Sequence, residues 1–510
     1  MLFVLLVAIS SVLLGAALSF VPTGSRGTLG YLRTFATLAA VAVVLTHLLP
    51  EALHGLGLWS ILLFLLGWFA PVVAHWAGRR TTSGHASQAV LEAGYWGLVV
   101  HHVADGIGLG AYARLPSTDG SHLDVVVALA AHTVPLIAVV SLAYRSAFGA
   151  RSAILRSLGL ALASVFGIGL SNLVSPVAIE RWAPFIAALA AGLLLHVVTH
   201  DLTADTPHTS AGRALDLLVA TLGIAVSALG LRSDGDAATW AFTDELSAFV
   251  ARSALPVLVG WAVVALEGRV FQPNSRANHA FGPARSLSAD SVLLSIAWFG
   301  FGWSAVRLVP LILFAFLPAL APPLASAKHE GYHARRSWSA RADETLLRAG
   351  PWLMLGLLVS ALLASAPTIS ASPHVLGRAL PIALLALVAN LTPVAAPAAV
   401  LISAGLSVSG LSLGAALVFA ALAPIVATHG LRARSRVLAT ALCVALGLAV
   451  DAFHLAHLPV PTAPPTPELA SFASLALLAL FLRGVYQRSA RLWVSTVVGT
   501  PSHDHAHHHH

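Results

Sequence analysis

Residues 99–113 read VVHHVADGIGLGAYA, an apolar stretch that carries two histidines and an aspartate. The stretch belongs to a predominantly apolar run, 88–111, that is long enough to cross a bilayer as a helix. An ionisable side chain at that depth is costly and usually faces a cavity or a partner. We therefore take His101, His102 and Asp105 as the first candidates for a functional site.

The whole chain has the composition of a polytopic helical membrane protein. Of its 510 residues, 57% are hydrophobic and only 10% are charged, and the mean hydropathy is +0.84. Long apolar stretches recur along the full length, whereas a membrane β-barrel would show short alternating segments. The predicted fold class is all-α. The first stretch, 2–20, lacks a basic region before it, so we interpret it as a spanning helix and not as a signal peptide.

Charge and cysteine content exclude several classes of function. The net charge is +7, but the arginines are scattered over short loops, which argues against a nucleic-acid partner. Cys443 is the single cysteine, so an internal disulfide or a thiolate metal cluster is excluded. The 24 histidines are the unusual feature, and the chain ends in HDHAHHHH (503–510), which is either a natural metal-gathering tail or a tag.

The first half of the chain predicts eight helices, at 2–20, 31–49, 58–76, 88–111, 124–146, 153–171, 178–200 and 213–231. Arginines are concentrated in the loops that follow the odd-numbered helices. This bias places those loops in the cytoplasm and the N-terminus outside. We expect residues 1–231 to form one membrane domain and the polar segment 232–248 to form a linker.

The second half, 249–485, continues the apolar pattern and brings the expected total to about fifteen spans. Its stretch 290–325 is long enough for two short helices with Arg307 between them. The residues 486–510 are predicted to form a polar, His-rich tail.

Helical spacing brings polar residues of the first half onto shared faces. His101 and Asp105 are four residues apart, so one lies above the other on the helix. The glycines that follow, Gly106, Gly108 and Gly110, would let another helix approach closely. Imidazole together with carboxylate is a ligand set that suits zinc and neighbouring divalent metals. Further candidates on other predicted helices are His47, Glu51, His132, His200 and Asp201.

Four motifs of this half, in order along the chain, resemble those of the ZIP family of divalent metal transporters. They are HLLPEA (47–52), HHVADG (101–106), HTVP (132–135) and AGLLLHVVTHDL (191–202). The resemblance covers about 1–231 and implies an eight-helix bundle in a bacterial inner membrane. It also implies a metal pathway with the fourth-helix ligands His101, His102 and Asp105, helped by His132. Along the route it implies His47, Glu51, His200 and Asp201.

The chain departs from the ZIP pattern in its acids. Thr133 and Leu136 stand where carboxylates are expected around His132, and the helix 153–171 contains no acid. A two-metal site bridged by carboxylates is therefore not available. The sequence predicts a single-metal pathway for Zn²⁺. Because only neutral imidazole coordinates a metal, binding should weaken below about pH 6.

The second half suggests an alternative function. Asn390, Thr392, Pro393 and Pro397 interrupt an apolar stretch, which predicts a broken helix. The region 345–455 resembles the predicted permease family that includes the arsenical permeases. In this alternative, a non-metal or metalloid solute passes through 379–424, and the ZIP-like half is vestigial or metal-sensing.

Enzymatic activity is not expected. HEGYH (329–333) fits the His-Glu-x-x-His pattern of zinc proteases, but Gly331 and polar flanks predict a loop instead of the regular helix that this chemistry needs. The expected partners are the divalent metal ion and membrane lipid. A homodimer remains an open alternative.

Overall fold

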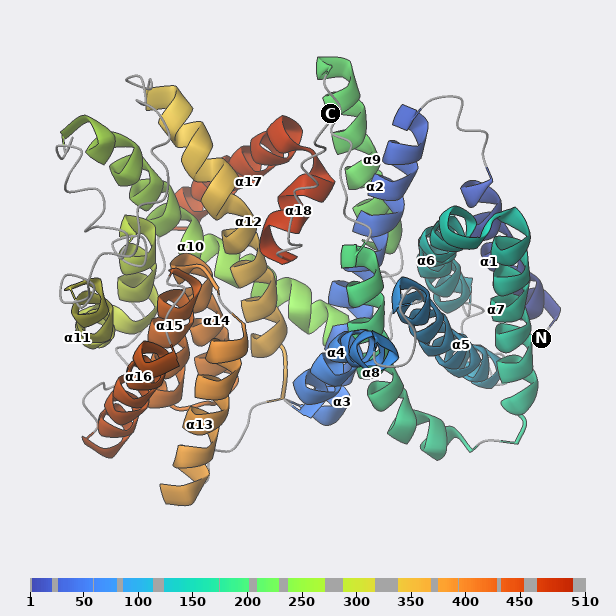
Figure 1. Ribbon diagram of the computed structural model, residues 1–510, viewed down its shortest axis with the longest axis horizontal. Coiled ribbons are helices and arrows are strands. Elements are labelled where there is room, and N and C mark those ends of the chain that lie inside the picture. Colours follow the sequence, from blue (N-terminus) through green and yellow to red (C-terminus); the bar gives the residue numbers. More distant parts are fainter. Residues whose placement is uncertain are drawn as a thin grey trace. The chain divides into compact units, whose positions relative to one another are not determined.

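A computed structural model describes residues 2–20, 26–57, 59–79, 86–112, 123–173, 175–200, 209–228, 237–270, 288–316, 338–367, 375–392, 394–428, 433–453 and 466–498, with the backbone alone at some helical positions. Nearly all of these residues are helical (Figure 1). Within the described ranges, eight helices are long and apolar enough to cross a membrane. The predicted class, an all-α membrane protein, is confirmed.

The chain folds into two compact units. The first comprises Met1–Phe242 together with Val485–His510, and the second comprises Thr243–Gly484. The division falls inside helix α10 (Ala237–Val270), so the segment predicted as a linker, 232–248, includes the first turns of a helix. The segment predicted as a polar tail, 486–510, likewise includes a helix, α18 (Ala490–Val498).

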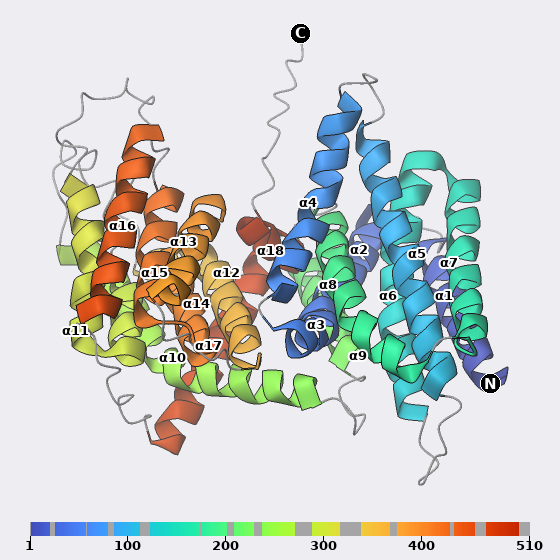
Figure 2. The same cartoon turned by 90° about the horizontal axis from the view of Figure 1, so that it is seen from below.

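The first unit is a bundle of paired helices. Its elements are α1 (Leu2–Ser19), α2 (Arg26–Val43), the π-helical turn η1 (Val44–Leu48), α3 (Leu49–Leu56), α4 (Trp59–Arg79), α5 (Ala86–Tyr112), α6 (Leu123–Phe148), α7 (Ala150–Leu170), α8 (Pro176–His200), α9 (Ser210–Ala228) and α18. The pairs α5–α7, α4–α8, α2–α9 and α1–α6 pack along their lengths (Figure 1 and Figure 2).

A glycine lies at a close backbone approach in each of these four pairs. A methyl group on Gly15, Gly106, Gly192 or Gly223 would collide with a backbone carbonyl oxygen of the partner helix. Helices in lipid associate through such close backbone packing, because lipid tails are as apolar as leucine. The expectation that glycines after Asp105 admit a second helix is confirmed for Gly106, and that helix is α7.

The C-terminal helix α18 is held on α2 and α9 by a buried polar network. Asp216 of α9 is 2% exposed; its Oδ1 accepts the Thr34 hydroxyl at 2.7 Å, and its Oδ2 accepts the Ala490 N–H at 3.1 Å. The Arg491 Nε donates to the same Thr34 hydroxyl oxygen at 3.1 Å. The carboxylate of Asp216 therefore caps the first turn of α18.

The second unit contains α10, α11 (Ala289–Phe316), α12 (Trp338–Ala364), α13 (Val375–Leu391), α14 (Ala396–Val408), α15 (Leu413–Thr428), α16 (Ala433–Phe453) and α17 (Pro467–Arg488). α14 and α15 are almost entirely buried, and they lie side by side in both views (Figure 1 and Figure 2). The core includes Trp261, Trp303 and Leu417.

Two local predictions for this unit have different outcomes. The broken helix is confirmed, because α13 ends at Leu391 and α14 begins at Ala396. The expectation of two short helices with Arg307 between them is wrong about the position of the break. The non-helical residue is Gly300, and Arg307 lies inside the second helical segment.

Candidate functional site

The two adjacent histidines of α5 are buried. His101 is 4% exposed and His102 is 2% exposed, both well inside a 27-residue helix. Imidazole rings in such an environment need polar partners, because burying an unsatisfied polar group is costly. Their partners define what the site can do.

His101 pairs with Asp105 one helical turn later. Its Nε2 lies 3.3 Å from Oδ2 of Asp105, and the two side chains are 5% and 17% exposed. Two ligands of a tetrahedral zinc ion, each at about 2.0–2.1 Å from the metal, stand about 3.3 Å apart. The pair is therefore already spaced as two neighbouring ligands of one ion.

His102 faces a different neighbour. Its Nδ1 lies 3.2 Å from the Ser164 hydroxyl of α7, and the centroids of the His101 and His102 rings are 5.9 Å apart. Successive residues of a helix are rotated by about 100°, so the two imidazoles leave α5 in different directions. Sequence analysis missed Ser164, because a serine among small residues carries no signal of its own.

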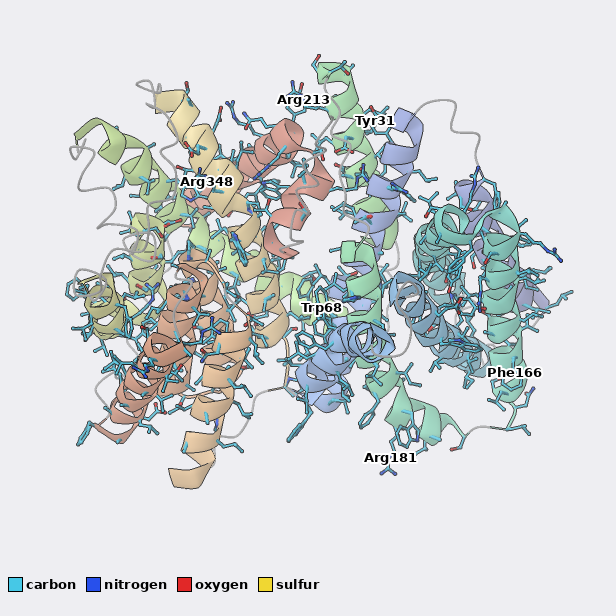
Figure 3. The ribbon with its side chains drawn as sticks, in the orientation of Figure 1. Tyr31, Trp68, Phe166, Arg181, Arg213 and Arg348 are labelled. Carbon is cyan, nitrogen blue, oxygen red and sulfur yellow. The ribbon has the colours of Figure 1, made fainter. Side chains whose placement is uncertain are left out.

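The face of α5 that carries His101 is turned toward α8. Gly97, one turn earlier, approaches so closely that a methyl group there would collide with Leu193 of α8. Residues four apart share a face, so His101 lies on this side of the helix. α8 also carries His196, whose ring makes an edge contact with Trp68 of α4 at 5.7 Å between centroids (Trp68 is labelled in Figure 3).

A polar cluster fixes the rotation of α5 against α6 and α7. Glu92 forms a 2.6 Å ion pair with Arg156, and the guanidinium of Arg156 lies over the rings of Tyr95 and Tyr144 at 4.7 and 5.4 Å. The Tyr144 hydroxyl donates to the carbonyl of Leu91 at 3.2 Å. These contacts lie two to three turns before His101 on α5, so they help to set the direction in which its ring points.

The second predicted motif lies on a distorted helix. His47 is half-buried in the π-helical turn η1, and Glu51 is exposed in the first turn of α3. A π turn widens the helix locally and is frequent at functional sites. η1 and α3 both pack on α8, the helix that carries His196.

The remaining predicted ligands lie at the edge of what the structure describes. His132 and His200 occupy helical positions in α6 and α8, but their side chains, and all of Asp201, lie outside the described residues. Among the described residues, no three His, Cys, Asp or Glu side chains form a group that could hold a metal ion. The geometry thus provides one pair, His101 and Asp105, and a third ligand stays a prediction.

Comparison with known proteins adds no identification. No family matches the chain, and neither a curated protein nor a solved structure matches it. The similarities to the ZIP and permease families therefore stay predictions from the motifs.

Proposed function

We propose that the first unit passes a divalent cation, with zinc as the preferred ion, through the membrane. His101 and Asp105 bind the ion, with His132 as the third ligand, and His102 lies beside the site as an alternative ligand. His47, Glu51, His200 and Asp201 line the route. The observation that carries this proposal is the pair of buried His101 and partly buried Asp105, with its 3.3 Å separation.

The charge of this pair suits transport better than storage. One carboxylate and neutral imidazoles leave a bound Zn²⁺ with a net positive site. A site that compensates the ion only in part binds it strongly enough to replace its water, but releases it more readily than a site with several carboxylates. A protein that only retained zinc would gain affinity from more anionic ligands.

Zinc flux into proteoliposomes tests the proposal in the full chain. We expect the His101→Ala/Asp105→Ala double variant to lose at least about tenfold in flux, because each removed ligand weakens coordination. His54→Ala is the matched control, since it removes an exposed imidazole from α3 and leaves the pair intact. Size-exclusion profiles establish that each variant is folded.

The possible results distinguish a transporter that uses this site, a protein that does not use it, and a protein that binds zinc without transporting it. Flux lost in the double variant and retained in His54→Ala supports the proposal. Unchanged flux in a folded double variant refutes it. If the intact chain bound zinc but showed no flux, the result would favour a metal-sensing membrane protein over a transporter. His132→Ala, measured in parallel, decides whether α6 supplies the third ligand.

A further inference from the structure

Helix α11 folds back on itself at Gly300. This residue has φ 76° and ψ 177°, a conformation that only glycine adopts readily. Nη1 of Arg307 donates to the carbonyl of Ser291 at 3.2 Å. An unbroken helix would separate these two residues by about 24 Å along its axis, far beyond the reach of an arginine side chain. α11 is therefore a hairpin with arms 289–299 and 301–316.

α14 and α15 form a second hairpin. Its turn contains Gly410, with φ 99°, and the Ser403 hydroxyl of one arm donates to the Ala416 carbonyl of the other at 2.9 Å. The arms are 13 and 16 residues long, or about 20 and 24 Å, and the hydrocarbon core is about 30 Å thick. Arms of this length are shorter than the hydrocarbon core, which is typical of re-entrant helices.

The two hairpins meet at their turns. The Trp303 indole N–H donates to the carbonyl of Leu413 at 3.2 Å, and each of these residues follows its turn glycine by three positions. Arg307 lies one turn after Trp303 on α11, and its Nε donates at 3.3 Å to the carbonyl of Ala420, two turns after Leu413 on α15. Arg307 therefore lies between the hairpins. Many transporters bind their solute where such half-helices meet.

Arg307 is fully buried, at 0% exposure, and its hydrogen-bonding capacity is not used up. Its guanidinium has five N–H donors, of which Nε and Nη1 reach carbonyls. Nη2 has no hydrogen-bond partner among the described residues. Asp290 is a buried acid that directly precedes Ser291. Its oxygens accept the Trp261 indole N–H at 3.1 Å and the Ser291 N–H at 2.9 Å.

An unsatisfied edge of a buried guanidinium is a place for an anion. Leaving a charged N–H donor unpaired at membrane depth is costly, and an oxygen of an anion that accepts from Nη2 would satisfy it. A cation would be repelled by the guanidinium. The neighbouring carboxylate of Asp290 balances part of the positive charge, but its oxygens accept from Trp261 and Ser291 and leave Nη2 without an acceptor. We propose that the second unit binds a small oxyanion between its two hairpins, with Arg307 as the anion-binding residue.

This inference is independent of the metal pathway in the first unit, because none of its residues belongs to that unit. The sequence predicted a solute site within 379–424, whereas this inference places the site between that stretch and α11. α15 contributes the Ala420 carbonyl, and α11 contributes the charged group that the motifs did not indicate. Carboxylates and inorganic oxyanions share the chemistry that would be recognised.

Binding of succinate, inorganic phosphate and sulfate to the full chain in detergent tests the proposal, with chloride at matched ionic strength as reference. The readouts are the unfolding midpoint and tryptophan fluorescence, because Trp303 bonds across the contact between the hairpins and Trp261 of α10 bonds to Asp290 on the first arm. We expect at least one anion to raise the midpoint with saturation. Arg307→Lys, which keeps the charge but loses the planar fork, should bind it about tenfold more weakly.

Arg348→Gln is the matched control, since this arginine is exposed and pairs with Glu344 on α12 (Arg348 is labelled in Figure 3). It should bind the anion as the intact chain does. An intact chain that responds to none of the three anions refutes the proposal, and so does an Arg307→Lys variant that responds as the intact chain does.

A second variant keeps the test decisive if changes at Arg307 prevent folding. Asp290→Asn removes the neighbouring negative charge and should increase the affinity for the anion several-fold. An unchanged affinity in Asp290→Asn would show that the anion binds elsewhere. Arg307 would then only stabilise the packing of the two hairpins.

Discussion

The packing of α5 on α7 predicts that Gly106→Ala destabilises the first unit. A Cβ atom at this position would overlap the Ser164 carbonyl oxygen and would lie 3.0 Å from both the Gly167 Cα and the Ile168 nitrogen. All three are backbone atoms, so a side-chain rotation cannot relieve the overlap. The two helices must separate by roughly 1 Å to restore ordinary contact distances.

The size of the effect follows from two opposing terms. Overpacking against backbone costs about 3 kcal/mol, at the upper end of the usual range, and the better helix propensity of alanine returns about 1 kcal/mol. We therefore expect a net loss of about 2 kcal/mol in the free energy of unfolding. For a unit of this size, such a loss lowers the unfolding midpoint by about 4–8 °C.

Thermal unfolding in detergent measures this loss directly. Gly169→Ala is the control, because it adds the same methyl group to α7 at a position where no heavy atom lies within 4 Å. That variant should be as stable as the natural chain or slightly more stable. If Gly106→Ala unfolded at or above the temperature of Gly169→Ala, the close backbone contact of α5 and α7 would be refuted.

Two further substitutions and one labelling experiment have defined outcomes. Asp216→Ala leaves the N–H of Ala490 without its acceptor, so hydrogen exchange in α18 should become faster, and unchanged exchange would contradict the capping contact. Gly300→Ala forces a positive φ on an L-residue and should cost about 1–3 kcal/mol, whereas Gly302→Ala, in open space, should be neutral; equal midpoints for the two would contradict the fold-back. Cys443, the only cysteine, is 1% exposed and should react with a maleimide only as the second unit unfolds, so labelling of the folded chain would contradict its burial.

The features that depend on neighbours along the chain could be predicted from the amino-acid sequence. Hydrophobic composition requires helices in a membrane, because backbone groups in lipid must be satisfied within the segment. The spacing of His101 and Asp105 places them on one face of any helix that contains them, and the structure has them 3.3 Å apart. The prolines of the stretch 390–397 predict a break in the helix, and the structure has α13 end at Leu391 and α14 begin at Ala396.

The features that depend on contact with another helix could be identified only from the folded chain. Ser164 became the neighbour of His102 because glycines let α7 approach α5, and the two residues are 62 positions apart. Asp216 holds α18 across 274 positions.

Arg307 shows the same limit of the sequence. Glycine is common in straight membrane helices, so the presence of Gly300 does not by itself predict a hairpin. Only the contacts with Ser291 and Ala420 reveal that this arginine is enclosed between two hairpins. Local propensity acts over about one helical turn, whereas packing energy depends on segments that are distant in the chain. The fold class could therefore be predicted from the sequence, and the surroundings of these polar groups could not.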